Sequence, residues 1–172
     1  VFIFSCYTGL AYVDVAKLKE DDIVIGMDGG RWIKVNRTKT KTLSSIPILP
    51  VAEQIISKYA SMINYENKLL PVYSNQKTNG YLKEIADLSG ITKKLTFHMA
   101  RHTFATTITL SNGVPIESVS KMLGHKSLKM KANYSQRILL SMRFYIRIFS
   151  FSKTNLFRNI PNRWLCHNCF AK

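Results

Sequence analysis

One stretch of this chain, residues 96–134, restricts its possible folds more than any other. It contains no glycine or proline between Phe97 and Leu110, which predicts a helix of about four turns with Thr96 as its N-cap. The sequence Ser-Asn-Gly then ends this helix, and Pro115 begins a shorter one that stops at the following glycine. The stretch therefore predicts two consecutive helices joined by a tight turn.

Five polar side chains lie at intervals along the same stretch. Arg101 and His102 follow His98 by three and four positions, so the three side chains lie on roughly one face of the first predicted helix. His125 follows the last glycine of the second helix, and Tyr134 comes nine residues later. A further helical turn or two would bring this tyrosine back toward the histidines.

These residue types can cut a phosphodiester without a metal ion. A tyrosine hydroxyl can attack phosphorus while fixed cations and donors hold the non-bridging oxygens. Arginine contacts two oxygens at once through its planar guanidinium, and neutral histidine donates or accepts a proton. Each residue alone has a simpler explanation, such as a solvent-facing histidine or a core tyrosine, so the prediction depends on the ordered set.

The motifs that carry this set resemble those of the tyrosine recombinases, the phage-type integrases. FHMARHTFAT contains the HxxR motif of that family, KMLGHKS contains its LGH motif, and KANYSQ contains its tyrosine. They are similar to the motifs of integrases from bacterial mobile elements, and the resemblance covers approximately residues 1–134. It implies an α+β catalytic domain over these residues, mostly helical, with a small three-stranded antiparallel sheet.

The resemblance also implies a role for each residue of the set. Tyr134 would attack the scissile phosphate, leaving a 3′-phosphotyrosine and a free 5′ hydroxyl, and His98 would accept its proton. Arg101 and His125 would hold the non-bridging oxygens, with His102 as a supporting residue. Religation reverses these steps and conserves the bond energy. We therefore expect site-specific recombination or integration of DNA that requires no cofactor and no metal ion.

One position near the N-terminus departs from the family pattern. The family's TGLR motif reads TGLA here, so Ala11 stands where the first catalytic arginine is expected. Asp14 matches the acidic position that supports the site. Loss of one oxyanion-stabilising donor typically slows a reaction by about 10²–10³, although some mobile-element integrases that lack this arginine supply the charge differently. Residues 1–10 predict the end of a buried helix that stops at Gly9, with the beginning of that helix absent.

Three strands are expected before the main helices. Residues 23–25 and 32–35 flank an Asp-Gly-Gly turn and predict a β-hairpin, and residues 46–49 predict a third strand. The loop between the second and third strands contains the basic sequence RTKTKT. By resemblance, Lys39 in this loop would protonate the departing 5′ oxygen, and Lys41 is the second candidate. A solvated basic loop that contacts phosphates is the alternative.

Two further helices are predicted, one that begins at Pro50 and one that runs from the N-cap Ser74 to Gly90. The apolar residues expected to face inward on the second of these are Leu82, Ile85, Ala86 and Leu88. The resemblance places this second helix close to DNA. The residues expected to contact the DNA backbone are Arg37, Lys41, Asn75, Gln76, Lys77 and Lys126. A solvated polar face explains these residues equally well.

The charge balance favours a nucleic acid partner. The 172 residues include 25 Lys and Arg against 10 Asp and Glu, a formal net charge of +15, which favours nucleic acid over an anionic membrane. The resemblance implies that this nucleic acid is double-stranded DNA. No apolar run is long enough to span a bilayer, so no membrane partner is expected. Three cysteines make no disulfide framework, which favours a reducing cytoplasm. The resemblance implies the bacterial cytoplasm and its nucleoid. The resemblance implies a homotetramer on paired DNA sites for the full-length protein.

Residues 135–172 differ in composition from the rest of the chain. They carry seven Lys and Arg but no acidic residue, and they mix aromatic residues with arginines without a helical period. The family would have a polar linker and a docking helix here, so we expect a degenerate or poorly ordered tail. Cys166 and Cys169 have the spacing of half a zinc site, and His98 and His102 stand four apart, but neither pair has the further ligands that a zinc site needs.

Two other functions remain open. A catalytically inactive DNA-binding remnant of an integrase would explain Ala11 and the unusual tail, and it would bind DNA in a salt-dependent way without a covalent product. A type IB topoisomerase would use similar chemistry but would relax supercoils alone, whereas a recombinase needs paired sites. The RHTFAT and LGH sequences favour the recombinase.

Overall fold

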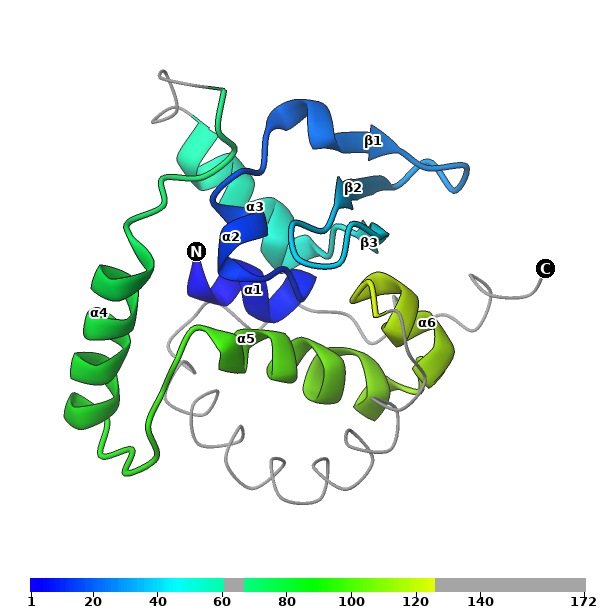
Figure 1. The fold of residues 1–172 in the computed structure, drawn as a ribbon. Coiled ribbons are helices and arrows are strands. Elements are labelled where there is room, and N and C mark those ends of the chain that lie inside the picture. The colour runs from blue at the N-terminus through cyan, green and yellow to red at the C-terminus, as the bar shows by residue number, and fades with distance from the viewer. Residues whose placement is uncertain (61–66, 126–172) are drawn as a thin grey trace.

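The computed structural model describes residues 1–60 and 67–125 (Figure 1). Tyr134, Lys126 and the tail at 135–172 lie outside these ranges, so the expectations about them stay predictions. The helical elements are α1 (Phe2–Thr8), α2 (Tyr12–Val15), η1 (Glu20–Asp22), α3 (Pro50–Tyr59), α4 (Asn75–Leu88), α5 (His98–Thr103), η3 (Phe104–Thr109), η4 (Leu110–Asn112) and α6 (Ile116–Met122). The strands are β1 (Ile23–Ile25), β2 (Arg31–Asn36) and β3 (Leu43–Pro47).

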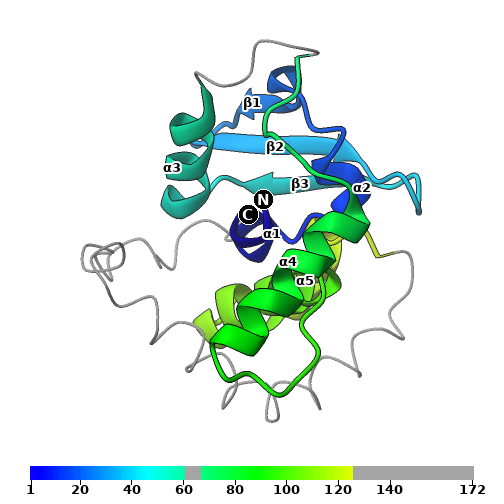
Figure 2. The same cartoon turned by 90° about the vertical axis from the view of Figure 1, so that its left-hand side faces the viewer.

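The helices pack against a three-stranded antiparallel sheet with the strand order β1-β2-β3, which confirms the predicted α+β class. Helix α1 lies between this sheet and helix α5 (Figures 1 and 2), and helix α6 contacts strand β3. In the central strand, Ile33 pairs with Ile23 on one side and with Ile46 on the other. Ile33 and Ile46 are fully buried, so the core sits between the sheet and the helices.

Helix α1 brings the N-terminal segment into contact with the helix that carries the HxxR motif. Phe4 and Leu10 are fully buried, and α1 packs against α3, α5 and η3. The helix ends at Gly9, as predicted, with a φ of 67°. A Cβ atom at this position would lie 2.5 Å from Cδ1 of Phe104. Glycine is therefore required both for the left-handed backbone and for the close approach of the two helices.

The sheet confirms the predicted hairpin and corrects the start of the third strand. Gly29 supplies a positive φ of 72° in the turn between β1 and β2. Strand β3 begins at Leu43, earlier than the predicted start at residue 46. Ser44 is fully buried in this strand because its hydroxyl donates a hydrogen bond to the Met122 carbonyl of α6. A polar side chain that the apolar pattern excluded is thus satisfied inside the core.

The predicted helix after residue 96 is present, but its hydrogen bonding changes along its length. It is an α-helix in α5, a π-helix in η3 and a 3₁₀-helix in η4. The Thr109 hydroxyl donates to two carbonyls of the preceding turn, a local bond that competes with the regular ladder. The prediction of Thr96 as N-cap is wrong, because Phe97 occupies that position with no side-chain cap bond. Pro115 and Ser74 precede α6 and α4 as predicted.

Helix α4 has a narrower buried face than the sequence predicts. Leu82 and Ala86 are buried against a small cluster that includes Phe97. Ile85 is 53% exposed and Leu88 is 89% exposed, so the prediction that these two residues face inward is wrong. The reason is tertiary: α4 packs on the rest of the described chain through one narrow stripe, and its remaining apolar residues stay on the surface.

Candidate active site

Arg101, the arginine of the HxxR motif, is buried at the centre of the candidate site. Helix α5 carries it, and only 7% of the residue is exposed. Its Nη1 donates to the Gly9 carbonyl at 2.8 Å, and its Nη2 donates to the Leu123 carbonyl. The ends of α1 and α6 therefore hold the guanidinium through backbone carbonyls, which fix its plane and carry no formal charge.

His125 lies beside Arg101, directly after helix α6. Gly124 adopts a φ of 61°, and His125 Nε2 lies 3.0 Å from Arg101 Nη2. Arginine can only donate, so Nε2 accepts this hydrogen bond, and a neutral ring then carries its proton on Nδ1. Burial, followed by the nearby Arg101 and Arg37 cations, lowers the pKa of His125 to about 4. The imidazole is therefore neutral at pH 7 and lies next to a fixed cation.

A buried ion pair between Asp14 and Arg37 forms the other side of the site. Asp14 is 5% exposed and Arg37 is 6% exposed. Arg37 Nε donates to Asp14 Oδ2 at 2.8 Å, and the Thr38 amide donates to Asp14 Oδ1 at 2.9 Å. Burial lowers the pKa of Arg37, and Asp14 opposes this shift by stabilising the cation. The carboxylate at the supporting position thus orients an arginine that comes from strand β2 and its loop.

The β2–β3 loop is joined to the turn that positions His125. The hydroxyls of Thr40 and Thr42 donate to the Gly124 carbonyl, at 3.2 Å and 2.9 Å. A Cβ atom at Gly124 would lie 2.8 Å from Arg37 Cγ and 2.8 Å from Thr42 Oγ1. Arg37 therefore packs directly over the glycine that precedes the site histidine.

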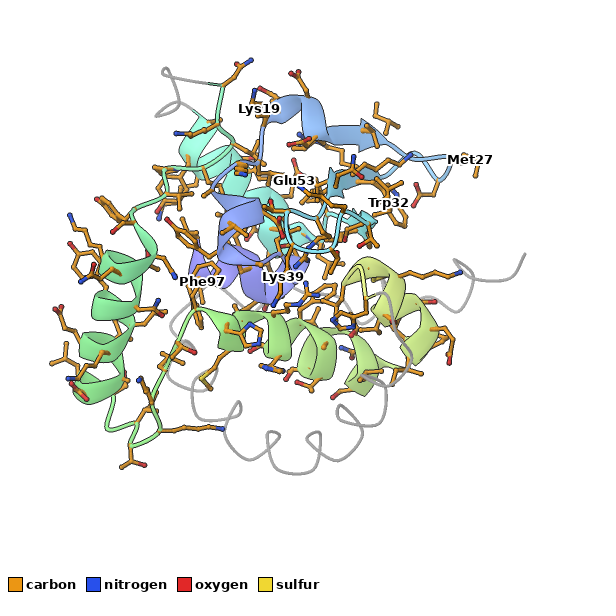
Figure 3. The ribbon with its side chains drawn as sticks, viewed as in Figure 1. Lys19, Met27, Trp32, Lys39, Glu53 and Phe97 are labelled. Atoms are coloured by element: carbon orange, nitrogen blue, oxygen red, sulfur yellow. The ribbon has the colours of Figure 1, made fainter. Side chains whose placement is uncertain are left out.

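The other predicted catalytic residues that lie within the described part of the chain occupy more accessible places. Lys39 and Lys41 are exposed on the β2–β3 loop, and Lys41 adopts a φ of 55°. In Figure 3, Lys39 lies at the side of the sheet that faces helix α5. His98 is exposed and His102 is half-buried, and their rings are nearly perpendicular with centroids 4.8 Å apart. Both histidines lie on α5 together with Arg101, as predicted.

The predicted DNA contacts of helix α4 lie apart from this cluster, since α4 and α6 are on opposite sides of the molecule (Figures 1 and 2). Asn75, Gln76 and Lys77 are all exposed in the first turn of α4. Lys77 Nζ lies 4.5 Å from the ring centre of Tyr73 and 5.8 Å from that of Tyr81. These cation–π contacts hold the ammonium group at the surface, where it stays accessible to an anion.

Sequence reasoning missed the buried position of Arg37, which it treats as a surface contact to DNA. The sequence of strand β2 contains a pattern that could have predicted the burial of Arg37. Ile33 and Val35 are buried while the residues next to them are more exposed, and Arg37 continues this period of two onto the buried face. The basic sequence RTKTKT conceals the pattern, because Arg37 reads there as one more solvated cation of the loop.

Within residues 1–60 and 67–125, no group of three or more His, Cys, Asp or Glu side chains is placed to hold a metal ion. Over that same part of the chain, no helix combines the length and apolar character needed to cross a membrane. Burial raises the pKa of the Cys6 thiol in α1 to about 12, so this thiol stays protonated at pH 7.

The described residues have the fold of site-specific recombinases whose structures have been solved. The crystal structure of XerH site-specific recombinase bound to palindromic difH substrate, a post-cleavage complex, matches the fold with a TM-score of 0.65. The match covers 87% of this chain and 44% of that one, at 17% sequence identity, and it therefore describes the fold alone.

The chain belongs to the phage integrase family, whose profile matches residues 2–138. It is 31% identical over 104 residues to tyrosine recombinase XerC of Rickettsia massiliae (strain Mtu5), and this alignment covers 53% of this chain and 32% of that protein. It is 31% identical over 137 residues to tyrosine recombinase XerD of Listeria innocua serovar 6a, and this alignment covers 74% of this chain and 46% of that protein. The chain thus spans less than half the length of these relatives.

Proposed function

We propose that residues 1–134 form the catalytic domain of a site-specific tyrosine recombinase, which cuts and rejoins double-stranded DNA through a 3′-phosphotyrosine. The observation that carries this proposal is the contact between buried Arg101 and neutral His125, 3.0 Å apart, in a chain of the phage integrase family. Two groups this close can contact the same phosphate. Backbone carbonyls fix Arg101 in advance and Arg101 in turn contacts His125, so little reorganisation is needed when charge develops on the oxygens.

The proposed reaction forms one bond, breaks one bond and transfers two protons. The Tyr134 oxygen bonds to phosphorus as the bond from phosphorus to the 5′ oxygen breaks. Free tyrosine has a pKa of about 10, so the hydroxyl must lose its proton during attack. We assign His98 as the acceptor, supported by His102, and Lys39 as the donor of a proton to the departing 5′ oxygen. Religation to a partner strand reverses these steps.

Arg101 and His125 have different roles in this scheme. The guanidinium supplies positive charge, which counts for more in a partly dry site than at the surface. The imidazole, with a pKa of about 4, supplies hydrogen bonding without charge at physiological pH. The reaction would therefore depend on arginine for charge and on histidine for geometry.

The proposed partner is double-stranded DNA, bound by a homotetramer on paired sites in the full-length protein. The net charge of +15 and the DNA-bound state of the XerH neighbour support this choice. The bacterial cytoplasm and its nucleoid are the proposed location. Besides the catalytic cluster, the residues proposed to contact the DNA backbone are Lys41, Asn75, Gln76, Lys77 and Lys126.

A nicked duplex made from the DNA that flanks the coding segment tests the proposal. A nick close to the scissile phosphate lets the short 5′-hydroxyl fragment dissociate, which traps the covalent intermediate. We expect a protein–DNA adduct on a denaturing gel, and we expect Tyr134→Phe to abolish it because phenylalanine has no hydroxyl. Binding of this DNA without any adduct would contradict the proposal.

The proton donor can be tested separately with a leaving group that needs no proton. Lys39→Ala should slow adduct formation by about 10²-fold on ordinary DNA and much less on DNA with a 5′-bridging sulfur at the scissile position. Lys41→Ala is the matched control on the same loop and should show no such difference. The opposite result for the two lysines would transfer the assignment to Lys41.

A DNA-binding remnant without catalytic activity is the second candidate, because Ala11 replaces an arginine that the family motif carries. Such a protein would bind DNA with a steep salt dependence and would form no adduct on any substrate. A topoisomerase, in contrast, would relax a supercoiled plasmid as a single chain. Adduct formation that leads to exchange only when two sites are present would favour the recombinase over both.

A further inference from the structure

Asn79 of helix α4 is hydrogen-bonded to the start of helix α5. Its Oδ1 accepts from the Phe97 amide at 2.8 Å, 18 positions later in the sequence. Phe97 is the N-cap of α5, and its amide has no partner within that helix. In a capping box the third residue of the helix would accept from this amide, but Ala100 stands there and has no acceptor in its side chain. Asn79 thus supplies from another helix the acceptor that the local sequence lacks.

The side chain of Phe97 is fixed as well as its amide. Only 4% of the residue is exposed, and it lies between α4 and helices α1 and α2 (Figure 3). Its ring meets those of Phe2 and Tyr12 edge to face, with centroids 6.0 Å and 5.5 Å apart. The residue immediately before His98 is therefore held in two ways, by packing of its ring and by the bond from its amide to Asn79.

His98 is the residue whose position depends most directly on this bond. It is the first residue of α5, and it is exposed. Its ring contacts that of His102 in the same helix, so the two imidazoles move together with the start of α5. Helix ends fray, and a misplacement of about 1 Å can slow a reaction by as much as 10²-fold. A bond that fixes the start of α5 therefore affects the group assigned to accept the tyrosine proton.

The other end of the Asn79 amide is also engaged. Its Nδ2 donates to the Asn75 carbonyl at 2.8 Å and to Asn75 Oδ1 at 3.0 Å. These two bonds orient the amide so that its oxygen accepts from Phe97. Asn75 is exposed in the first turn of α4, where a contact with the DNA backbone is proposed. Asn79 thus connects a proposed DNA contact to the start of the helix that carries His98.

We propose that Asn79 is a positioning residue for His98. By accepting from the Phe97 amide it fixes the first turn of α5, and with it the imidazole that takes the proton of Tyr134. This inference rests on the proposed function. Asn79 contacts none of the reacting atoms in this scheme, and no bond to it forms or breaks. Its contribution to the rate should therefore disappear when the imidazole of His98 is removed.

The simpler alternative is that Asn79 only joins α4 to the rest of the described chain. Loss of that role would lower the fraction of folded protein, or weaken the binding of DNA through α4. Neither effect changes the rate at which folded, DNA-bound protein cuts its substrate. Single-turnover kinetics with protein in saturating excess over DNA measure that rate and separate it from binding.

The experiment measures adduct formation on the nicked duplex in single turnover, and the affinity for the same DNA. The variants are Asn79→Ala, Asn79→Asp, His98→Ala and the double variant Asn79→Ala with His98→Ala. Asn79→Asp keeps an oxygen that can accept from the Phe97 amide and loses the donating nitrogen. Thr78→Ala is the matched control, because the Thr78 hydroxyl donates to the Ser74 carbonyl at the start of the same helix.

We expect His98→Ala to slow adduct formation by about 10²-fold or more and Asn79→Ala to slow it by about tenfold. The double variant should be no slower than His98→Ala, because the effects of two residues that act as a unit are not additive. Asn79→Asp and Thr78→Ala should react at rates close to that of the unaltered chain, even where the aspartate weakens the affinity for DNA.

An equal slowing by Asn79→Ala with and without His98 would overturn the positioning role and leave the proposed function intact. An unchanged rate for Asn79→Ala, or a rate for Asn79→Asp as low as that of Asn79→Ala, would do the same. Absence of an adduct with the unaltered chain would overturn both the positioning role and the proposed function.

Discussion

Two arginines flank His125, and the protein holds them in different ways. Arg101 lies on a helix, and two backbone carbonyls accept its N–H groups. Arg37 follows a strand, and its partner is the carboxylate of Asp14. Both guanidinium groups are buried, but one is oriented by uncharged dipoles and the other by a full negative charge.

This difference indicates where the positive charge of the site resides. A carbonyl orients a guanidinium and leaves its charge in place. A carboxylate in contact with the guanidinium, in contrast, cancels most of the electrostatic field that the cation exerts on more distant groups. We therefore expect Arg101 to supply most of the electrostatic stabilisation and Arg37 to supply directed hydrogen bonds. Four sets of substitutions separate these contributions, and their expected effects decrease in the order that follows.

Arg101→Ala should have the largest effect. It removes a buried cation and leaves two buried carbonyls without their donor, so adduct formation on nicked DNA should fall by about 10³-fold. Arg101→Lys keeps the charge without the planar fork and should recover part of the loss. Single-turnover cleavage measures both rates. A loss smaller than that of Arg37→Ala would reverse the comparison between the two arginines.

Asp14→Asn should have the next largest effect, this time on stability. It leaves the Arg37 cation buried without its carboxylate, and breaking a buried ion pair from one side typically costs about 3–5 kcal/mol. Asp14→Asn combined with Arg37→Gln should cost less than the sum of the two single changes, because no charge remains buried. Urea unfolding at pH 7 measures the three free energies. Strict additivity would show that the pair is not coupled.

Gly124→Ala tests the contact between the two sides of the site. The φ of 61° strains alanine, and its Cβ would lie 2.8 Å from Arg37 Cγ, so we expect a loss of about 2 kcal/mol in unfolding free energy. Gly113→Ala is a matched control, because Gly113 has a φ of 78° with no atom within 4 Å of an added Cβ. It should lose about 1 kcal/mol, from backbone strain alone.

Adduct formation distinguishes the two glycines further. Gly124→Ala should slow it by displacing Arg37 and the turn before His125, whereas Gly113→Ala should leave it close to that of the unaltered chain. Equal effects of the two substitutions on stability and on cleavage would mean that the packing of Arg37 over this turn contributes to neither stability nor cleavage.

The smallest expected effect is a pH dependence of stability that belongs to His125. Its pKa is lowered from 6.5 to about 4, so the unfolded chain binds a proton between these values while the folded chain does not. The stabilisation from His125 is thus complete above pH 6.5 and is lost as the pH falls toward 4. Because the ring is only half-buried, screening by solvent limits this to about 1 kcal/mol.

His125→Gln, which cannot take up a proton, measures this contribution. Urea unfolding of both proteins at pH 7.5 and pH 4.5 should show a larger loss of stability for the unaltered chain than for the variant. The same loss in both would mean that other groups account for the pH dependence and that the two arginines do not act on this imidazole.

Much of the fold could be predicted because its signals are local. The helix with His98 and Arg101, the turn at Gly29 and the glycine before His125 depend on residues within a few positions of one another. The errors arose where tertiary packing, and not the local sequence, decided the outcome. Ser44 is buried in β3 because α6 offers it an acceptor, and Leu88 stays exposed although it is apolar.

The candidate site shows the same division. The HxxR motif lies on α5 and the Gly-His turn directly follows α6, close to it in the sequence, and the structure brings Arg101 and His125 into contact. Arg37 was predicted as a contact to DNA, and its burial was not predicted. Its burial depends on Asp14 from helix α2 and on Gly124 after helix α6, neither of which is near it in the sequence.

The sequence by itself thus determined the family, the order of the helices and the arginine and histidine of the motifs, because regular spacing places residues on a helix face or at a turn without reference to the rest of the chain. Only the tertiary structure decided that Arg37 turns inward beside His125. A basic residue after a strand is as favourable in water as in an ion pair, and it becomes buried only when packing brings a carboxylate within hydrogen-bonding distance.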